Sequence, residues 1–281
     1  MKHRAGLTLL FCSLAVGCGR SPIGVFPADM RSEEAFDPAI DGCSNVDYLF
    51  IVDNSASMAN NQHKLALGVS DFIHGVGGVL ESVESVHVGV MTTDAYEHNT
   101  PGCEHLGALV TQTGGHNSLE QTCGPFAEGQ RFMTEQDDLE AGLECAIRVG
   151  TTGSTSERPL GALRAALEPR TDDVAVCNEG FFRSDAMLVV VFLTDEDGVN
   201  DTLTYDALVR AKGGNPESVV VLSIAHTEED TCARSGHAIQ ANTLMSFTRQ
   251  FEHGLTESIC ANSFEGSFER ATDVIQAACG E

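Results

Sequence analysis

The chain has 281 residues and a mass of 29.9 kDa, with 42% hydrophobic and 20% charged residues. This composition excludes intrinsic disorder for most of the chain and allows a sizeable core. Asp and Glu number 41 against 16 Lys and Arg, which gives a formal net charge of -25. A field of this sign repels phosphate backbones, so nucleic acid is excluded as a partner class, and the acidity itself is interpreted as a solubilising surface.

The first residues have the pattern of a secretory signal. Residues 2–4 are basic, and the apolar stretch 5–17 that follows ends in small residues. The segment Ala15-Val16-Gly17-Cys18 resembles the lipobox of bacterial lipoproteins, which implies cleavage after residue 17 and lipidation of Cys18. The alternative is ordinary cleavage, with Cys18 left as a free thiol or in a disulfide.

The next segment is predicted to be a tether, because residues 19–42 are polar, contain three Pro and show no periodicity. The expected organisation is a signal peptide at 1–17, a lipid-anchored tether at 18–42 and one folded domain at 43–281. The longest later apolar run, 187–193, is too short for a transmembrane helix. We therefore expect an exported envelope lipoprotein, and Arg20, where an Asp is associated with inner-membrane retention in some bacteria, favours the outer membrane.

From residue 43 onward, apolar runs alternate with amphipathic stretches. The runs predict strands at 46–52, 86–92, 187–194 and 218–225, and the amphipathic stretches predict helices at 64–80, 137–149, 159–167, 204–211, 238–251 and 268–278. The strand at 187–194 is apolar on both faces, as in a central parallel strand that is covered by helices on each side. The pattern therefore predicts an α/β fold with a doubly wound, mostly parallel sheet flanked by helices.

Cysteine counting predicts a domain with disulfide-stapled loops. Once Cys12 is removed with the leader and Cys18 is assigned to lipid, eight remain: Cys43, Cys103, Cys123, Cys145, Cys177, Cys232, Cys260 and Cys279. An even number in an exported chain without a Cys-x-x-Cys pair indicates disulfides rather than a zinc site. Of the 105 pairings that eight cysteines allow, spacing favours Cys43–Cys279, Cys103–Cys123 and Cys232–Cys260, which leaves Cys145–Cys177. The Gly-rich region 94–129 is then predicted to be an ordered loop that the Cys103–Cys123 disulfide closes.

Oxygen-bearing side chains follow two of the predicted strands. Asp53, Ser55 and Ser57 come directly after the strand at 46–52, and Asp195 comes after the strand at 187–194. Ligands of open α/β sheets bind beyond the carboxyl ends of the strands, where the strand order reverses. Such donors suit Mg²⁺ or Mn²⁺, and a larger number of carboxylates suits Ca²⁺. The alternative for the first loop is that Asp53 and Ser57 only cap the following helix.

These two loops resemble those of the von Willebrand factor type A (vWA) family. Its metal-ion-dependent adhesion site (MIDAS) has Asp-x-Ser-x-Ser after the first strand, a Thr in a second loop and an Asp in a third. Asp53, Ser55 and Ser57 match the first element and Asp195 matches the third. The resemblance covers about 43–281. It implies a vWA/Rossmann-like fold and a divalent cation held by these four residues, partly through water at the two carboxylates, with one position open to an oxygen of a protein ligand.

The second loop departs from the family pattern. Counting back from Ala162-Leu163 places Glu157 where the family has its metal-binding Thr, with Thr155 and Ser156 beside it. Glu157 as a ligand would favour Ca²⁺ and would take the position of a partner's acidic side chain. The alternative is that Glu157 is a first-turn residue favoured by the helix dipole.

Two further groups of polar residues are weaker candidates. Asp197, Asn200 and Asp201 extend the cluster at Asp195, but their spacing lacks the EF-hand pattern, so a solvated acidic loop is preferred over a separate calcium site. The histidines that lie in predicted loops lack the spacing of zinc ligands and are interpreted as surface residues: His98, His105, His116, His226 and His237.

The sequence therefore predicts a non-enzymatic, metal-dependent protein-binding or adhesion module on the bacterial cell envelope, with membrane contact through the lipid anchor only. One alternative is a structural envelope domain with a vestigial metal site. Another is a metal-assisted hydrolase with Glu157, Glu196 or Asp197 as general base. The first-strand turn lacks the glycines of a dinucleotide site, Ser55 replaces the second Asp of haloacid dehalogenase-type phosphatases, and no Gly-x-Ser-x-Gly segment occurs.

Overall fold

The structure is a computed structural model that describes residues 36–38, 43–79, 83–230, 232 and 241–280. The predicted signal peptide at 1–17, the lipidation site Cys18 and nearly all of the tether at 18–42 lie outside these residues. Within the described residues, no helix combines the length and the apolar character needed to cross a membrane.

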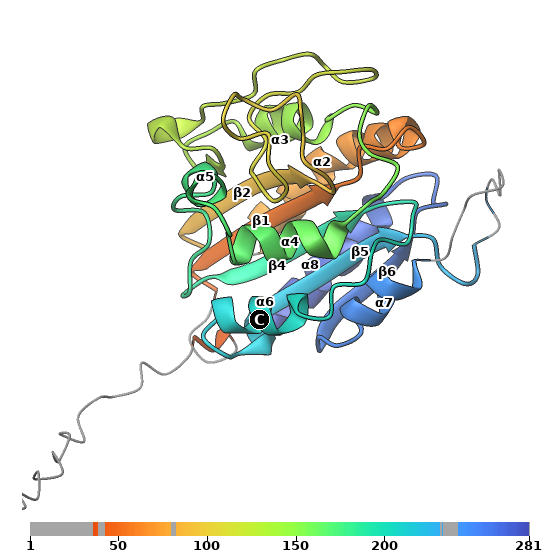
Figure 1. The fold of residues 1–281 in the computed structure, drawn as a ribbon. Helices are drawn as coiled ribbons and strands as arrows, with labels where there is room; N and C mark the ends of the chain where they lie inside the picture. Colours follow the sequence, from red (N-terminus) through yellow and green to blue (C-terminus); the bar gives the residue numbers. More distant parts are fainter. Residues whose placement is uncertain (1–35, 39–42, 80–82, 231, 233–240, 281) are drawn as a thin grey trace, which may run out of the picture. The chain divides into compact units, whose positions relative to one another are not determined.

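One six-stranded sheet, with the strand order β3-β2-β1-β4-β5-β6, forms the centre of the domain (Figure 1). Its strands are β1 (Asn45–Val52), β2 (Ser85–Thr92), β3 (Met133–Thr134), β4 (Met187–Leu193), β5 (Val219–Ala225) and β6 (His253–Ser258). All neighbours pair in parallel except β3, which is antiparallel to β2. The order reverses at β1, whose neighbours are β2 and β4, so the carboxyl ends of β1 and β4 flank the switch point. The predicted doubly wound, mostly parallel sheet is confirmed.

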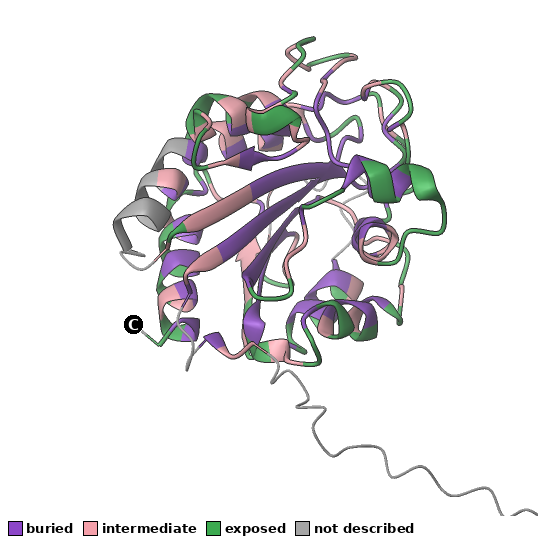
Figure 2. Ribbon diagram, turned by 90° about the vertical axis from the view of Figure 1, so that its left-hand side faces the viewer, coloured by how far each residue is buried: buried purple, intermediate pink, exposed green. Residues whose placement is uncertain are grey.

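Helices cover both faces of the sheet: α2 (Ala59–Val79), α3 (Leu139–Ile147), α4 (Pro159–Leu167), α5 (Asp172–Cys177), α6 (Thr204–Ala211), α7 (Asn242–Thr248) and α8 (Glu265–Ala278). Successive side chains of a strand point to opposite faces. Tyr48 and Phe50 of β1 pack in the core cluster of α2, α3 and α8, whereas Leu49 and Ile51 pack in the cluster of α4, α6 and α7. The central strands β1, β4 and β5 are therefore buried on both sides (Figure 2).

Several elements differ from the prediction. The helix α2 starts at Ala59 rather than at residue 64, and α7 is shorter than the predicted 238–251. The strand β6 was not predicted, because its sequence, HGLTES, is largely polar and only partly buried at the edge of the sheet. Its place is determined by parallel pairing with β5 and by Gly254, where an added Cβ would lie 2.1 Å from the carbonyl oxygen of Thr248.

The four disulfides confirm two predicted pairs, Cys43–Cys279 and Cys232–Cys260, and correct the other two, which are Cys103–Cys177 and Cys123–Cys145. The region 94–129 is an ordered excursion, but no disulfide closes it on itself. It folds back along β2, where the Val110 N–H donates to the Val90 carbonyl over 2.7 Å. Its two cysteines thus bond to α5 and α3, because tertiary neighbours rather than the shortest chain spacing decide the pairing.

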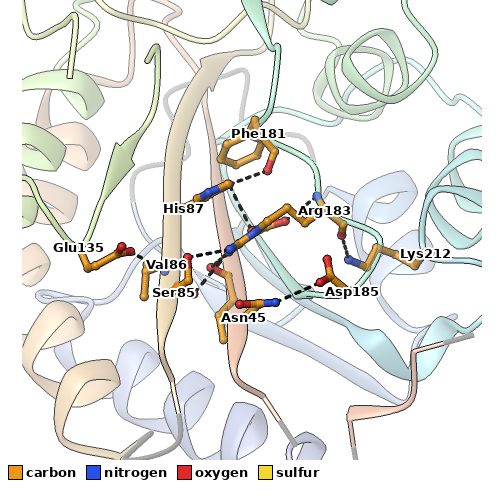
Figure 3. A network of polar contacts seen from close by, with 11 residues as sticks. Asn45, Ser85, Val86, His87, Glu135, Phe181, Arg183, Asp185 and Lys212 are labelled. Atoms are coloured by element: carbon orange, nitrogen blue, oxygen red, sulfur yellow. Dashed lines mark hydrogen bonds and ion pairs between the residues drawn. The ribbon is translucent and has the colours of Figure 1, made fainter. Parts of the chain in front are cut away.

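A buried polar network lies at the amino ends of the central strands (Figure 3). Asp47 is fully buried, and the Arg183 side chain donates from Nε to its Oδ1 over 2.7 Å. Arg183 also donates to the Ser85 hydroxyl over 2.8 Å, and His87 lies 3.6 Å from Asp47. Burial raises the pKa of Asp47, and the Arg183 charge offsets this only in part. The network attaches the segment before β4 to β1 and β2.

Lys212, which follows α6, donates from its buried Nζ to the Arg183 carbonyl over 2.6 Å. Burial lowers its pKa to about 8 from 10.5. Between these two values the unfolded chain binds the additional proton, so the free energy of unfolding rises with pH across this window, by up to about 3 kcal/mol. We expect guanidinium unfolding at pH 7.5 and pH 10 to show this rise in the wild type and not in Lys212→Met. Parallel pH profiles for the two proteins would contradict the assignment.

Candidate metal site

Asp53 connects the loop after β1 to the end of β4. Its backbone N–H donates to the Leu193 carbonyl over 2.9 Å, and its buried carboxylate accepts from Ser55 N at 2.7 Å and from the Thr194 hydroxyl at 2.6 Å. Burial raises its pKa to about 6, and the charge of Asp195 adds to the rise, while the Thr194 and Ser55 hydrogen bonds lower it. The sheet topology thus brings the two predicted loops together.

Two hydroxyl groups bridge the space between the carboxylates. The Oγ atoms of Ser55 and Ser57 lie 3.2 Å apart, and Ser57 Oγ donates to Asp195 Oδ1 over 3.0 Å. Within the described residues, neither Asp53 nor Ser57 accepts a hydrogen bond from a backbone N–H of α2, so the structure does not use them as helix caps. A continuous row of oxygens therefore runs from Asp53 to Asp195.

Glu157, in the loop before α4, lies close enough to Asp53 for the two charges to interact. Its side chain is buried, Oε2 accepts from the Thr93 hydroxyl, and Oε1 has no hydrogen-bond partner. Burial, followed by the negative charge of Asp53, raises the pKa of Glu157 to about 9. Thr155 and Ser156 are exposed. Glu157 precedes the N-cap residue of α4 and faces the protein interior, which is not the exposed first-turn position expected for a residue that serves only the helix dipole.

Sequence reasoning missed Thr93 and Asp94. They follow β2, at the same carboxyl end of the sheet as Asp53 and Asp195. Asp94 Oδ2 accepts from Ser154 N over 2.7 Å, and Oδ1 accepts from Asn54 Nδ2 over 3.1 Å. Gly153 fits against Asn54, since an added Cβ would lie 2.4 Å from Asn54 Cγ. Asp94 therefore holds the loop that presents Glu157 against the loop after β1. The sequence signal that could have identified Asp94 was its position just after the predicted strand at 86–92.

The other candidate ligands do not join this cluster. Asp197 accepts from the backbone N–H and hydroxyl of Thr243 at the start of α7, over 3.0 and 3.1 Å, and Asp201 pairs with Arg164 at 2.6 Å. These contacts fix loops and form no separate calcium site with Asp195. Histidines also lie elsewhere: His98 bonds to the Thr152 hydroxyl, and His226 approaches Cys232 and Cys260, which are already joined in a disulfide. The backbone carbonyl of His116 accepts from Thr151 N, His105 lies 3.7 Å from Asp173, and His237 lies outside the described residues.

The donor set fits a hard divalent cation. The donors are all carboxylate or hydroxyl oxygens, which suit Mg²⁺, Mn²⁺ or Ca²⁺. Among the described residues, no Lys, Arg or His forms an ion pair with Asp53, Glu157 or Asp195. In this structure Asp53, Glu157 and Asp195 do not all bring an oxygen within 4.8 Å of one another, so one of them would reach a shared cation through water. A buried carboxyl oxygen without a partner is costly, and a bound cation would offset that cost.

Fold and site together define a doubly wound α/β domain with an oxygen-lined site at its switch point. No protein-family profile and no curated protein matches the sequence. The chain is similar to three solved structures of proximal thread matrix protein 1 (PTMP1) from the mussel byssus, one of them with a zinc-occupied MIDAS motif. Identities are 14%, 15% and 14%, and TM-scores are 0.45, 0.40 and 0.42. The matches cover 85%, 84% and 85% of this chain but 49%, 47% and 49% of those chains, so it spans about half their length.

Proposed function

We propose that this protein is a metal-dependent protein-binding or adhesion module. The observation that supports the proposal best is Glu157 Oε1, a buried carboxyl oxygen without a hydrogen-bond donor, near the charge of Asp53 at the strand ends. Two buried carboxyl groups this close are costly unless a positive charge neutralises them. A cation at the switch point of the sheet would neutralise them and leave the exposed side of the site open to a partner.

Asp53, Ser55, Ser57, Glu157 and Asp195 are the residues that would hold the cation. When bound, the ion supplies a positive centre that accepts an oxygen atom of a partner protein. Three carboxylates around one site favour Ca²⁺, with Mg²⁺ and Mn²⁺ as the other candidates, because charge count and ligand number distinguish these ions. Asp94 and Thr93 position the ligands, through Ser154 and Glu157 respectively.

Binding is proposed rather than catalysis. Of the three carboxylates that a hydrolase would use as a general base, Asp197 is engaged by Thr243 and Glu157 is assigned to the cation, which leaves Glu196 as the candidate base. A base must reach the proton of an attacking water next to the substrate. Asp197, held by Thr243, and Glu157, held by the cation, are not free to do so.

The cellular setting of the proposal comes from the sequence. The basic and apolar leader and the segment ending in Cys18 support a lipoprotein of the bacterial cell envelope, with the outer membrane as its location. Membrane contact would then be through the lipid anchor only, and the net charge of -25 argues against a nucleic-acid partner.

A calorimetric titration of Ca²⁺, Mg²⁺ and Mn²⁺ into the chelator-treated full chain tests the proposal. We expect saturable binding in the wild type and an affinity at least about tenfold lower in Asp53→Asn, which keeps the shape of the side chain and removes its charge. Asp273→Asn, on the exposed side of α8, serves as the charge-matched control and should bind like the wild type. No heat with any of the ions from folded wild-type protein would leave a structural domain with a vestigial site.

A further inference from the structure

A pocket of about 240 Å³ lies directly beside the candidate metal site. Its walls come from the loop after β2 and from residues 152–154, and Asn54, between the proposed ligands Asp53 and Ser55, also lines it. A partner that reaches the cation therefore passes next to this pocket. A role for the pocket in choosing that partner rests on the proposed function, because both concern the same binding event.

The pocket wall includes groups that act only as acceptors. Asp94 and Glu97 contribute carboxylates, one almost buried and one exposed. Asn54 is 1% exposed, and its amide donates to Asp94, which leaves its Oδ1 buried with no hydrogen-bond partner. An acceptor of this kind is satisfied only by a donor.

Positive charge is scarce at the same place. No Lys or Arg is among the described residues that line the pocket. The one basic side chain, His98, has its Nε2 2.9 Å from the Thr152 hydroxyl and 3.5 Å from Glu97. The wall therefore carries negative charge without a Lys or Arg, and its residue Asn54 has a buried amide oxygen that no donor satisfies.

The pocket is large enough for a side chain. Its volume is about 240 Å³. Both oxygens of Asp94 also already accept N–H bonds, from Asn54 and Ser154, which fixes the carboxylate in place. A long side chain with a cationic, donor-only end matches both the volume and the acceptors.

We propose that this pocket receives a Lys or Arg side chain of the partner protein that binds at the cation site. Lys and Arg carry donors and no acceptors, and their hydrogen bonds to carboxylates are charge-assisted. The partner then presents a basic residue next to the oxygen that reaches the cation. The overall negative charge of the chain favours encounter with the same class of partner.

Selection from a random heptapeptide phage library on the immobilised full chain, in Ca²⁺ and about 0.15 M salt to screen non-specific attraction, tests this inference. We expect Lys and Arg to be enriched at least threefold over the unselected library on the wild type. The enrichment should disappear on Glu97→Gln and persist on Glu252→Gln, a change of the same charge at an exposed carboxylate between α7 and β6. A pool without basic enrichment, or equal enrichment on Glu97→Gln, overturns the inference.

The Asp53→Asn variant distinguishes this result from a failure of the proposed function. If the wild type binds no cation by calorimetry, yet its selected peptides are basic and depend on Glu97, the pocket is a basic-residue site and the metal function is wrong. If the cation binds through Asp53 and the peptides are not basic, the metal function stands and the pocket has another role.

Discussion

Replacing Glu157 by Gln is expected to make the metal-free protein more stable and the metal-bound protein weaker. Glu157 is buried, its Oε1 has no donor, and the nearby charge of Asp53 disfavours its ionisation. Leaving a buried carboxyl group unsatisfied costs about 1–3 kcal/mol, and more when the group is charged. The amide has the same shape and keeps the hydrogen bond from Thr93, and because it carries no charge it avoids the cost of a carboxyl that ionises beside Asp53.

Cation affinity should change in the opposite direction in Glu157→Gln. Loss of a carboxylate ligand is expected to weaken Ca²⁺ binding by about 100-fold, the upper end of what even indirect partners of a metal contribute. Guanidinium unfolding in chelator and a Ca²⁺ titration of the same preparation measure both effects. A variant that binds Ca²⁺ like the wild type would exclude Glu157 as a ligand. A variant less stable than the wild type in chelator would show that its carboxyl has a structural role instead.

Replacing Arg183 by Met is expected to lower the free energy of unfolding by about 3–5 kcal/mol, because it removes the guanidinium that pairs with the buried charge of Asp47. Arg183 donates to Asp47 from both its side chain and its backbone, over 2.7 and 3.0 Å. The pKa of Asp47 is raised by burial even with Arg183 present, so the ion pair does not fully offset the desolvation of the carboxylate.

The double variant Asp47→Asn/Arg183→Met serves as the control for this prediction. It removes both charges and keeps an acceptor for the backbone N–H of residue 183, so we expect it to recover most of the lost stability. Guanidinium unfolding of the wild type, the single variant and the double variant completes the comparison. A loss below about 1 kcal/mol in Arg183→Met, the range of exposed pairs, would show that Asp47 is neutral or otherwise compensated.

The fold class was predictable because it depends on local periodicity. Strands such as β4 are apolar throughout, and α4 and α6 have the bounds that their sequence pattern predicts. The edge strand β6 has no such pattern, and its conformation depends on pairing with β5. Elements that bury their own apolar side chains are visible in a sequence, and elements that rely on a neighbour are not.

The candidate site divides in the same way. The sequence by itself determined which oxygen donors lie together after β1 and β4, because the carboxyl ends of parallel strands meet at the same end of the sheet. Only the tertiary structure decided that Asp94 orders the Glu157 loop, that Glu157 faces inward beneath Thr93, and that Cys103 pairs with Cys177. The last two contacts join residues 64 and 74 positions apart. Chain spacing does not encode such contacts, because packing of the whole domain selects them.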